Sequence, residues 1–187
     1  SVVDGAGTAV ALTASIGSAF GCRTVSSLGF VYNDALAEFT MDDYGQRAAT
    51  KGPNFPRGGA RPVSSHAPVV VLRGERVELV GGASGGLRAG TALGLVLLRH
   101  LRQGVPLEQA VAAPRLHVPW SGALLLETPL AGLEPKLVAR GEVVRVEPAN
   151  FASVSAIAAR EEEGLRRLLP VFDPRKGGAV TVQRSTK

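Results

Sequence analysis

The sequence has little cysteine and no long apolar run, and each scarcity excludes a class of protein. Its only cysteine among 187 residues is Cys22, so the chain can build neither an internal disulfide framework nor a thiolate metal cluster by itself. The best apolar run, residues 92–98, ends at Arg99 and falls far short of the roughly 18 apolar residues that a membrane-spanning helix needs. We therefore expect no membrane span, no metal site and no cofactor.

Aromatic residues are also scarce, at 5% of the chain, whereas basic residues are not. Lys and Arg number 21 against 16 Asp and Glu, which gives a net charge of +5 and would suit an anionic partner. The arginines, however, are scattered from Arg23 to Arg184, and few aromatic side chains interleave with them as a stacking platform for bases. We predict that the protein does not bind nucleic acid.

The overall composition is that of a folded globular protein. Hydrophobic residues make up 45% of the chain and charged residues 20%, far from the composition of a disordered segment. The length fits one folding unit, so we predict a single domain over residues 1–187. The N-terminus lacks the features of a secretory signal, so any export signal is expected upstream of residue 1, and the sequence assigns no compartment.

The order of the expected strands and helices predicts an α+β fold. Glycine turns at residues 5–7 and 73–76 indicate two hairpins, and the first strand of the second, residues 68–72, is apolar enough to be buried on both faces. Helices are expected at residues 87–103, 106–112 and 130–140, and further strands at residues 28–32, 123–127, 143–146, 153–158 and 180–183. Strands, then helices, then strands again are typical of a layered α+β domain. Residues 45–59 form a long loop, and such loops often carry function.

The strongest local signal is the glycine cluster at residues 81–86. Gly85 and Gly86 stand where an apolar strand meets the start of the longest expected helix. The first N–H groups of a helix have no partner within it and point along the positive end of its dipole, so this turn can hold an anion. A phosphate-binding loop is one interpretation, but the Lys-Ser/Thr that usually completes such a loop is missing here. An oxyanion hole fits the pattern as well as a phosphate-binding loop or better. The third interpretation is a tight turn without a ligand.

Two adjacent hydroxyls, Ser64 and Ser65, lie between Pro62 and Pro68, where the backbone is stiff. Paired hydroxyls can hydrogen-bond a carboxylate without carrying charge themselves. Taken alone, this pattern favours a plain turn over a binding site. His117 has no second ligand at metal-binding spacing, so we expect a packed or hydrogen-bonded histidine there.

Seven short motifs, taken together, resemble those of the gamma-glutamyltranspeptidases in order and spacing. They are residues 1–4, 20–21, 33–39, 61–65, 82–86, 113–117 and 173–175. The resemblance covers nearly the whole chain, which is identified as similar to the smaller, C-terminal subunit of that family. It implies the family's four-layer αββα sandwich, an N-terminal-nucleophile hydrolase fold that a large and a small subunit build together after a precursor cleaves itself.

The resemblance also implies a reaction. In that family a newly exposed N-terminal threonine attacks a gamma-glutamyl amide, and water or an acceptor amine then takes the acyl group. The protein is thus expected to transfer or hydrolyse gamma-glutamyl groups of glutathione-like substrates, with a large subunit as its partner. Two alternatives stay open: a related acylase for glutaryl or other acyl amides, and a catalytically silent homologue with a structural or binding role.

Several residues match the family's site. Gly85 and Gly86 match its oxyanion-hole glycines, and Ser64 and Ser65 match the serines that hold the substrate α-carboxylate. Ser15 matches a threonine that hydrogen-bonds the nucleophile. Two positions on, the family often has Asn, whereas this chain has Gly17, so one hydrogen bond to the substrate or its surroundings is expected to be missing.

The acidic residue that receives the substrate α-amino group has two candidates. A reading of residues 33–39 without a gap places Glu38 there, whereas residues 41–44 match the local letters better but need an insertion, which places Asp43 there. We favour Glu38. Either choice leaves Ala35 or Thr40 where the family usually has Gln or Glu, so weaker or different recognition of the amino group is expected.

The nucleophile is expected upstream of this chain. The family's catalytic threonine precedes the residue that matches Ser1 by a few positions. Ser1 itself is a chemically legitimate terminal nucleophile, but we favour an ordinary strand residue at that position.

Overall fold

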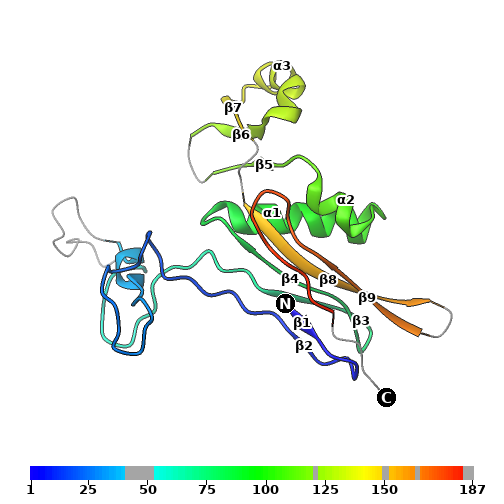
Figure 1. Cartoon of the computed structure of the whole chain (residues 1–187). Coiled ribbons are helices and arrows are strands. Elements are labelled where there is room, and N and C mark those ends of the chain that lie inside the picture. The colour runs from blue at the N-terminus through cyan, green and yellow to red at the C-terminus, as the bar shows by residue number, and fades with distance from the viewer. Residues whose placement is uncertain (41–52, 120–121, 149–151, 163–164, 183–187) are drawn as a thin grey trace. The chain divides into compact units, whose positions relative to one another are not determined.

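The computed structural model describes residues 1–40, 53–119, 122–148, 152–162 and 165–182 (Figure 1). Contacts divide the chain into two compact units, Ser1–Thr13 with His66–Lys187, and Ala14–Ser65. Each unit is described on its own, and the single domain over residues 1–187 stays a prediction. No helix among the described residues is long and apolar enough to cross a membrane.

The first unit is built on a four-stranded antiparallel sheet. Its strand order is β3, β4, β8, β9, with bounds Val69–Arg73, Arg76–Ser84, Ser153–Glu162 and Leu165–Val171. The hairpin expected around residues 73–76 is confirmed, because β3 and β4 pair from Arg73↔Arg76 to Val69↔Gly81. Strand β8 pairs with β4 from Leu79↔Ala158 to Ser84↔Ser153, and this pairing brings the end of β4 beside the start of β8.

Two helices cover one face of this sheet (Figure 1). They are α1, Arg88–Leu97, and α2, Leu107–Ala112; a π-helical turn, Leu98–Arg102, continues α1. The apolar positions of α1 recur at helical spacing, and Ala89, Leu93 and Val96 are buried against the sheet. Burial of a Leu or Val side chain stabilises the fold by about 1.5–3 kcal/mol, so this face holds the core of the unit.

The other face of the sheet is only partly covered by the described chain. The N-terminal hairpin, β1 Val2–Val3 with β2 Ala9–Val10, is confirmed and contacts β4. Val70 and Leu72 of β3 nevertheless remain 43% and 56% exposed. Within this chain, β3 thus keeps one partly exposed face, and its burial on both faces stays a prediction for the protein assembled with its partner.

A smaller sheet lies on the opposite side of α1 from the main sheet (Figure 1). It holds β5 Leu116–His117, β6 Leu124–Glu127 and β7 Val144–Glu147, in that order. Strands β6 and β7 run parallel, and the crossover between them contains a 3-10 helix, η3 Thr128–Leu133, and α3 Glu134–Val138. The helix expected at residues 130–140 is thus confirmed in position, with a first part that is 3-10.

In the part of the second unit that the structure describes, loops surround one 3-10 turn, η1 Ala35–Glu38. The strand expected at residues 28–32 is wrong: only a single bridge, Val25↔Val31, forms, because the chain reverses at Ser26, whose carbonyl accepts Gly29 N–H at 3.0 Å. Residues 180–182, the described part of another expected strand, are also not in a sheet.

Candidate functional site

The Gly85–Gly86 turn joins the end of β4 to the start of α1. Both residues have positive φ, 143° and 58°, a region that side chains with a Cβ rarely adopt. The carbonyls of Gly85 and Gly86 accept Arg88 N–H and Ala89 N–H at 3.3 and 3.0 Å, so the N–H groups of the two glycines lie ahead of the helix and are not used by it. A Cβ built at Gly86 would meet no atom within 4 Å. The turn therefore offers backbone donors beside open space at the positive end of α1.

The segment after β9 lies against this turn. Lys176 Nζ donates a hydrogen bond of 3.2 Å to Oγ of Ser84, the residue before Gly85. Asp173 Oδ2 accepts Val154 N–H at 3.0 Å, and Val154 pairs with Ala83 across the sheet. Residues 173–176 are thus fastened to the strands that carry the glycine turn.

A buried cluster of charges holds that segment in place. Arg115 and Asp173, both fully buried, form an ion pair of 2.7 Å, and Arg175 pairs with Glu127 at 2.7 Å and with Asp173 at 3.1 Å. Arg175 also donates to the carbonyls of Val111 and Ala113 at 3.1 Å, and so satisfies acceptors at the C-terminal end of α2. The cluster joins α2, β6, β8 and the segment beside the glycine turn.

The Asp173 carboxyl of the cluster stays ionised at neutral pH. Burial alone would raise the pKa of the Asp173 carboxyl, but hydrogen bonds from the Val154 and Arg175 amides and the Arg115 guanidinium outweigh it, so that pKa lies below its ordinary value. The Glu127 carboxylate, in turn, raises the pKa of Arg175. The charged cluster therefore has a structural role. It holds residues 173–176 against the strands that carry the glycine turn.

His117 is a packed histidine, as expected. Its ring Nδ1 lies 2.9 Å from Thr91 Oγ1 of α1, and only 6% of the residue is exposed. Burial, and to a smaller extent the Arg88 charge, lower the pKa of His117. Among the described residues no group of three His, Cys, Asp or Glu side chains is placed to hold a metal.

Four other predicted site residues, Ser15, Glu38, Ser64 and Ser65, belong to the second unit. Ser15 Oγ accepts Gly17 N–H at 2.9 Å, and Glu38 ends η1 with an exposed side chain. Asp43 lies outside the described residues. The placement of these residues near Gly85 and Gly86 stays a prediction.

Asn54 connects the expected amine-binding and carboxylate-binding segments, and the sequence reasoning missed it. Its Nδ2 donates to the Glu38 carbonyl at 2.8 Å and to Thr40 Oγ1 at 3.1 Å. Its Oδ1 accepts Val63 N–H at 2.8 Å, directly before Ser64 and Ser65. The only signal in the sequence was its place in the segment, residues 45–59, that was predicted to be a long loop. The structure thus brings the end of η1 and the serine pair together through one amide side chain.

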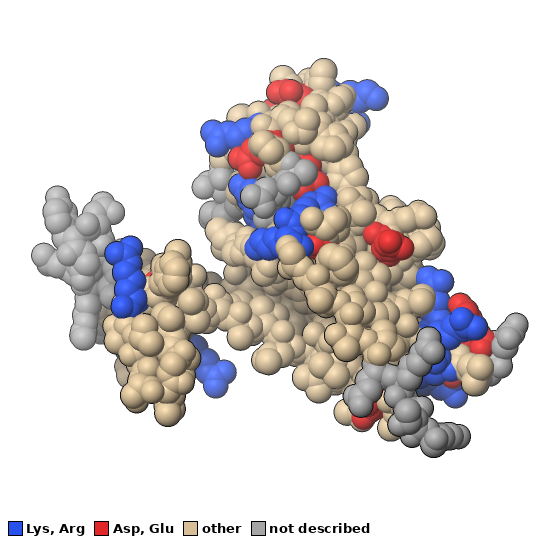
Figure 2. Space-filling model, in the orientation of Figure 1, with Lys and Arg blue, Asp and Glu red and all other residues tan. Residues whose placement is uncertain are grey.

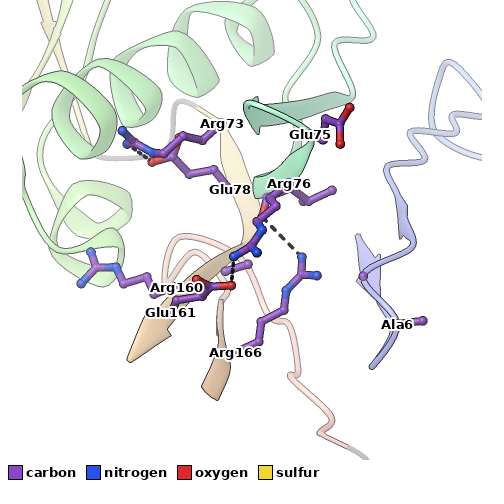
Figure 3. A pocket seen from close by; sticks show the side chains of 11 residues that line it. Ala6, Arg73, Glu75, Arg76, Glu78, Arg160, Glu161 and Arg166 are labelled. Carbon is purple, nitrogen blue, oxygen red and sulfur yellow. Dashed lines mark hydrogen bonds and ion pairs between the residues drawn. The ribbon is translucent and has the colours of Figure 1, made fainter. Parts of the chain in front are cut away.

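A cavity of about 700 Å³ in the first unit contains none of the predicted site residues (Figure 3). It lies between the turns that follow β1 and β3 and the β8–β9 hairpin. Its charges largely pair with one another: Arg73 with Glu78, and Arg76 with Glu161. Figure 2 shows basic and acidic residues beside one another at several other places on the first unit as well. We do not assign the catalytic site to this cavity.

Nearly the whole chain matches one known protein family. The family model described as gamma-glutamyltranspeptidase matches residues 1–183. The chain belongs to the gamma-glutamyltranspeptidase family. The resemblance inferred from seven motifs is therefore confirmed.

Individual members of the gamma-glutamyltranspeptidase family resemble the chain as follows. It is 34% identical over 126 residues to a glutathione hydrolase proenzyme of Pseudomonas sp. (strain A14), and 29% identical over 199 residues to glutathione hydrolase 2 of Arabidopsis thaliana. These matches cover 64% and 95% of this chain but only 22% and 34% of the two relatives, so the chain spans about a third of their length or less.

A solved gamma-glutamyltranspeptidase variant from Helicobacter pylori has the same fold. It superimposes with a TM-score of 0.83 at 27% identity, over 94% of this chain and 97% of that chain. The expected α+β fold of an N-terminal-nucleophile hydrolase small subunit is thereby confirmed. The roles of the individual site residues remain predictions.

Proposed function

We propose that this chain is the small-subunit part of an enzyme that transfers or hydrolyses gamma-glutamyl groups of glutathione-like amides. The observation that carries the proposal is the Gly85–Gly86 turn, where two backbone N–H groups stand ahead of α1 beside open space. Family membership gives this turn its chemistry, and the reaction needs no metal or cofactor.

The proposed reaction proceeds in two steps. A hydroxyl nucleophile gives its proton to a base and adds to the gamma-carbonyl carbon of the donor, and the carbonyl oxygen becomes an oxyanion that the N–H groups of Gly85 and Gly86 stabilise. The C–N bond breaks, and the amine leaves after it takes up a proton. Water or an acceptor amine then attacks the acyl ester, loses its own proton and releases the nucleophile. The geometry of the glycine turn supports the charged intermediate of both steps.

The same proposal assigns the donor's amino-acid end to the second unit. Ser64 and Ser65 would hold the α-carboxylate, and Glu38, or Asp43, would receive the α-ammonium group. Asn54 supports this division because it hydrogen-bonds both the Glu38 carbonyl and the backbone just before Ser64. Ser15 would hydrogen-bond the nucleophile.

A large subunit of the same precursor is the proposed partner. The chain spans 22–34% of two relatives, one of which is named a proenzyme, yet it covers 97% of the matched chain of a solved family member. On the second face of the main sheet Val70 and Leu72 are exposed, as are Val2 and Val10 of the N-terminal hairpin. Apolar surface of this kind suits a permanent partner. Expressed alone, the chain should aggregate and be inactive, and co-expression with the large subunit should rescue it; an active 187-residue monomer would exclude the partner.

Serine variants test the proposed function. In the complete two-chain protein, the Ser64→Ala/Ser65→Ala double variant should lower kcat/KM for gamma-glutamyl-p-nitroanilide by about a hundredfold, since two hydrogen bonds to a charged group are lost. The same variant should leave turnover of 4-aminobutyryl-p-nitroanilide, which lacks the α-carboxylate, unchanged. Ser27→Ala, an exposed serine of the same unit, is the matched control.

Each other outcome counts against the proposal. Equal losses with both substrates would remove the carboxylate role of the serines. No turnover of any gamma-glutamyl amide by the assembled wild-type protein would contradict the enzyme and favour a silent homologue. Glutaryl amides turned over faster than gamma-glutamyl amides would identify an acylase instead.

A further inference from the structure

The carboxylate of Asp34 occupies the space in which a side chain at position 17 would begin. A Cβ built on Gly17 would overlap Asp34 Oδ1 and lie 2.9 Å from its carboxyl carbon. Gly17 also has a φ of +82°, which disfavours a larger residue. Gly17 and Asp34 are therefore complementary, because the missing side chain of one is filled by the carboxylate of the other.

Hydrogen bonds fix Asp34 against the turn that contains Ser15. The Asp34 N–H donates to the Ile16 carbonyl at 3.1 Å, and Asp34 Oδ1 accepts Ser18 N–H at 3.0 Å. Ser15 Oγ accepts the N–H of Gly17, which lies between these two contacts. All of these residues belong to the second unit. The carboxylate is thus held in one place beside the hydroxyl that matches the family's nucleophile-binding threonine.

The Asp34 carboxylate carries a charge that the described chain does not neutralise. Hydrogen bonds from the Ser18 side chain, and then from its backbone, lower the pKa of Asp34, so it is ionised at neutral pH. No Lys or Arg among the described residues forms an ion pair with it. An ionised carboxylate has about four acceptor positions, so capacity remains for a cationic donor.

Asp34 and Glu38 also bracket the same 3-10 turn. Asp34 directly precedes η1, its carbonyl accepts Ala37 N–H at 2.8 Å, and Glu38 ends the turn. Glu38 was the first candidate for the ammonium of the donor. A second acid at the start of the same turn places negative charge on both ends of the segment expected to meet that group.

We propose that Asp34 is a specificity-determining residue that binds the α-ammonium group of the gamma-glutamyl donor from the space left open at Gly17. The proposal rests on the proposed function. Weaker or different recognition of the amino group was expected, and a hydrogen bond was expected to be missing because Gly17 stands where the family often has Asn. In the proposed arrangement, the Asp34 carboxylate takes the place of that Asn amide. The consequence is a preference for gamma-glutamyl over glutaryl amides that depends on the charge of residue 34.

The Asp34→Asn variant isolates that charge. Asn keeps the shape and the Oδ1 acceptor for Ser18 N–H but loses the negative charge. In the complete protein, the KM for gamma-glutamyl-p-nitroanilide should rise by about tenfold or more, as expected for a lost hydrogen bond to a charged group, while kcat stays within about twofold. The kcat/KM for glutaryl-p-nitroanilide, which has no ammonium group, should not change.

Asp4 provides a matched control, because it clamps a glycine turn of the first unit in the same way. Its Oδ1 accepts Thr8 N–H at 2.8 Å, and the hydrogen bond to Thr8 lowers its pKa too. Asp4→Asn should leave the ratio of gamma-glutamyl to glutaryl turnover unchanged. If Asp34→Asn does not fold, Asp34→Ser, which retains a short acceptor without charge, should show the same loss of preference.

The outcomes separate this proposal from the proposed function. If wild type turns over gamma-glutamyl amides but Asp34→Asn loses both substrates equally, Asp34 only holds the turn, and the proposal is overturned. An unchanged preference in either Asp34 variant also overturns it. If the assembled wild-type protein turns over neither substrate, it is the proposed function that has failed.

Discussion

Arg115 and Asp173 form an ion pair of 2.7 Å between two side chains that are both fully buried. Arg115 precedes β5 and Asp173 follows β9, so the pair joins segments nearly sixty residues apart. It is completed by Arg175 and Glu127, and it fixes the segment that contacts Ser84 beside the glycine turn. Both motifs that carry these residues were part of the family resemblance, and the structure gives them a common physical role.

Removal of one partner of that pair should destabilise the protein strongly. Asp173→Asn keeps the shape of the side chain but leaves the Arg115 charge buried without its partner, which costs about 3–5 kcal/mol. The midpoint of thermal unfolding of the complete protein should fall accordingly. Arg167→Ala, which breaks the exposed pair with Glu162, should cost less than about 1 kcal/mol. Equal midpoints for the two variants would contradict the role of the buried cluster.

Stability should fall as the pH drops below the ordinary pKa of histidine. The folded state lowers the pKa of His117, mainly by burial, so unfolded chains bind a proton there more readily than folded ones. This loss of stability is absent well above about pH 6.5. It grows as the pH falls through about 6.5, the pKa of histidine in the unfolded chain. Asp173, whose pKa is also lowered, loses its contribution only below about pH 4.

The measurement compares unfolding midpoints at about pH 7.5 and about pH 5.5. Wild type should lose stability over this interval, and His117→Gln should lose less of it, because the titrating group is gone. His66→Gln, at an exposed position, is the control. A variant that loses as much stability as wild type would show that His117 is not the group responsible.

Asn54 should act on substrate affinity more than on turnover. Asn54→Ala removes the hydrogen bonds to the Glu38 carbonyl, Thr40 and Val63, each worth about 1 kcal/mol, and so loosens the spacing between the two recognition segments. The KM for gamma-glutamyl-p-nitroanilide should rise about tenfold or more, with a smaller change in kcat. Ser26→Ala, which removes a local cap of Leu28 N–H in the same unit, should leave KM alone. Unchanged KM in Asn54→Ala would remove the link.

The sequence predicted those parts of the fold whose causes are local. The β3–β4 hairpin follows from the glycine-containing turn at residues 73–76, and α1 follows from apolar residues at helical spacing that end before Gly104. Strand β9 was missed because residues 165–171 alternate poorly; it is a strand because it pairs with β8. The π-helical turn at Leu98–Arg102 likewise has no local signature in the sequence.

The candidate site, too, could be predicted only where its signal is local. Adjacent glycines and adjacent serines can be recognised in the sequence itself, and they predicted Gly85, Gly86, Ser64 and Ser65. Asn54 and Asp34 were missed because their roles depend on partners 9 to 18 positions away, which only the folded chain brings together. The role proposed for Asp34 depends on Gly17, because Gly17 has no side chain in the space that the Asp34 carboxylate occupies.

The most direct test of the central claim is the steady-state rate of Gly86→Val in the complete, processed protein. A β-branched residue cannot easily adopt the φ of +58° at this position, so it should displace a donor of the proposed oxyanion hole. Loss of one such donor costs about 3 kcal/mol at the transition state. Gly90→Ala, at a position of α1 where a Cβ also meets open space, is the control.

We expect Gly86→Val to assemble with its partner, as judged by gel filtration, and to release p-nitroaniline from gamma-glutamyl-p-nitroanilide about a hundredfold more slowly than wild type, while Gly90→Ala keeps the wild-type rate. A correctly assembled Gly86→Val protein with an unchanged rate would contradict the assignment of the oxyanion hole to this turn.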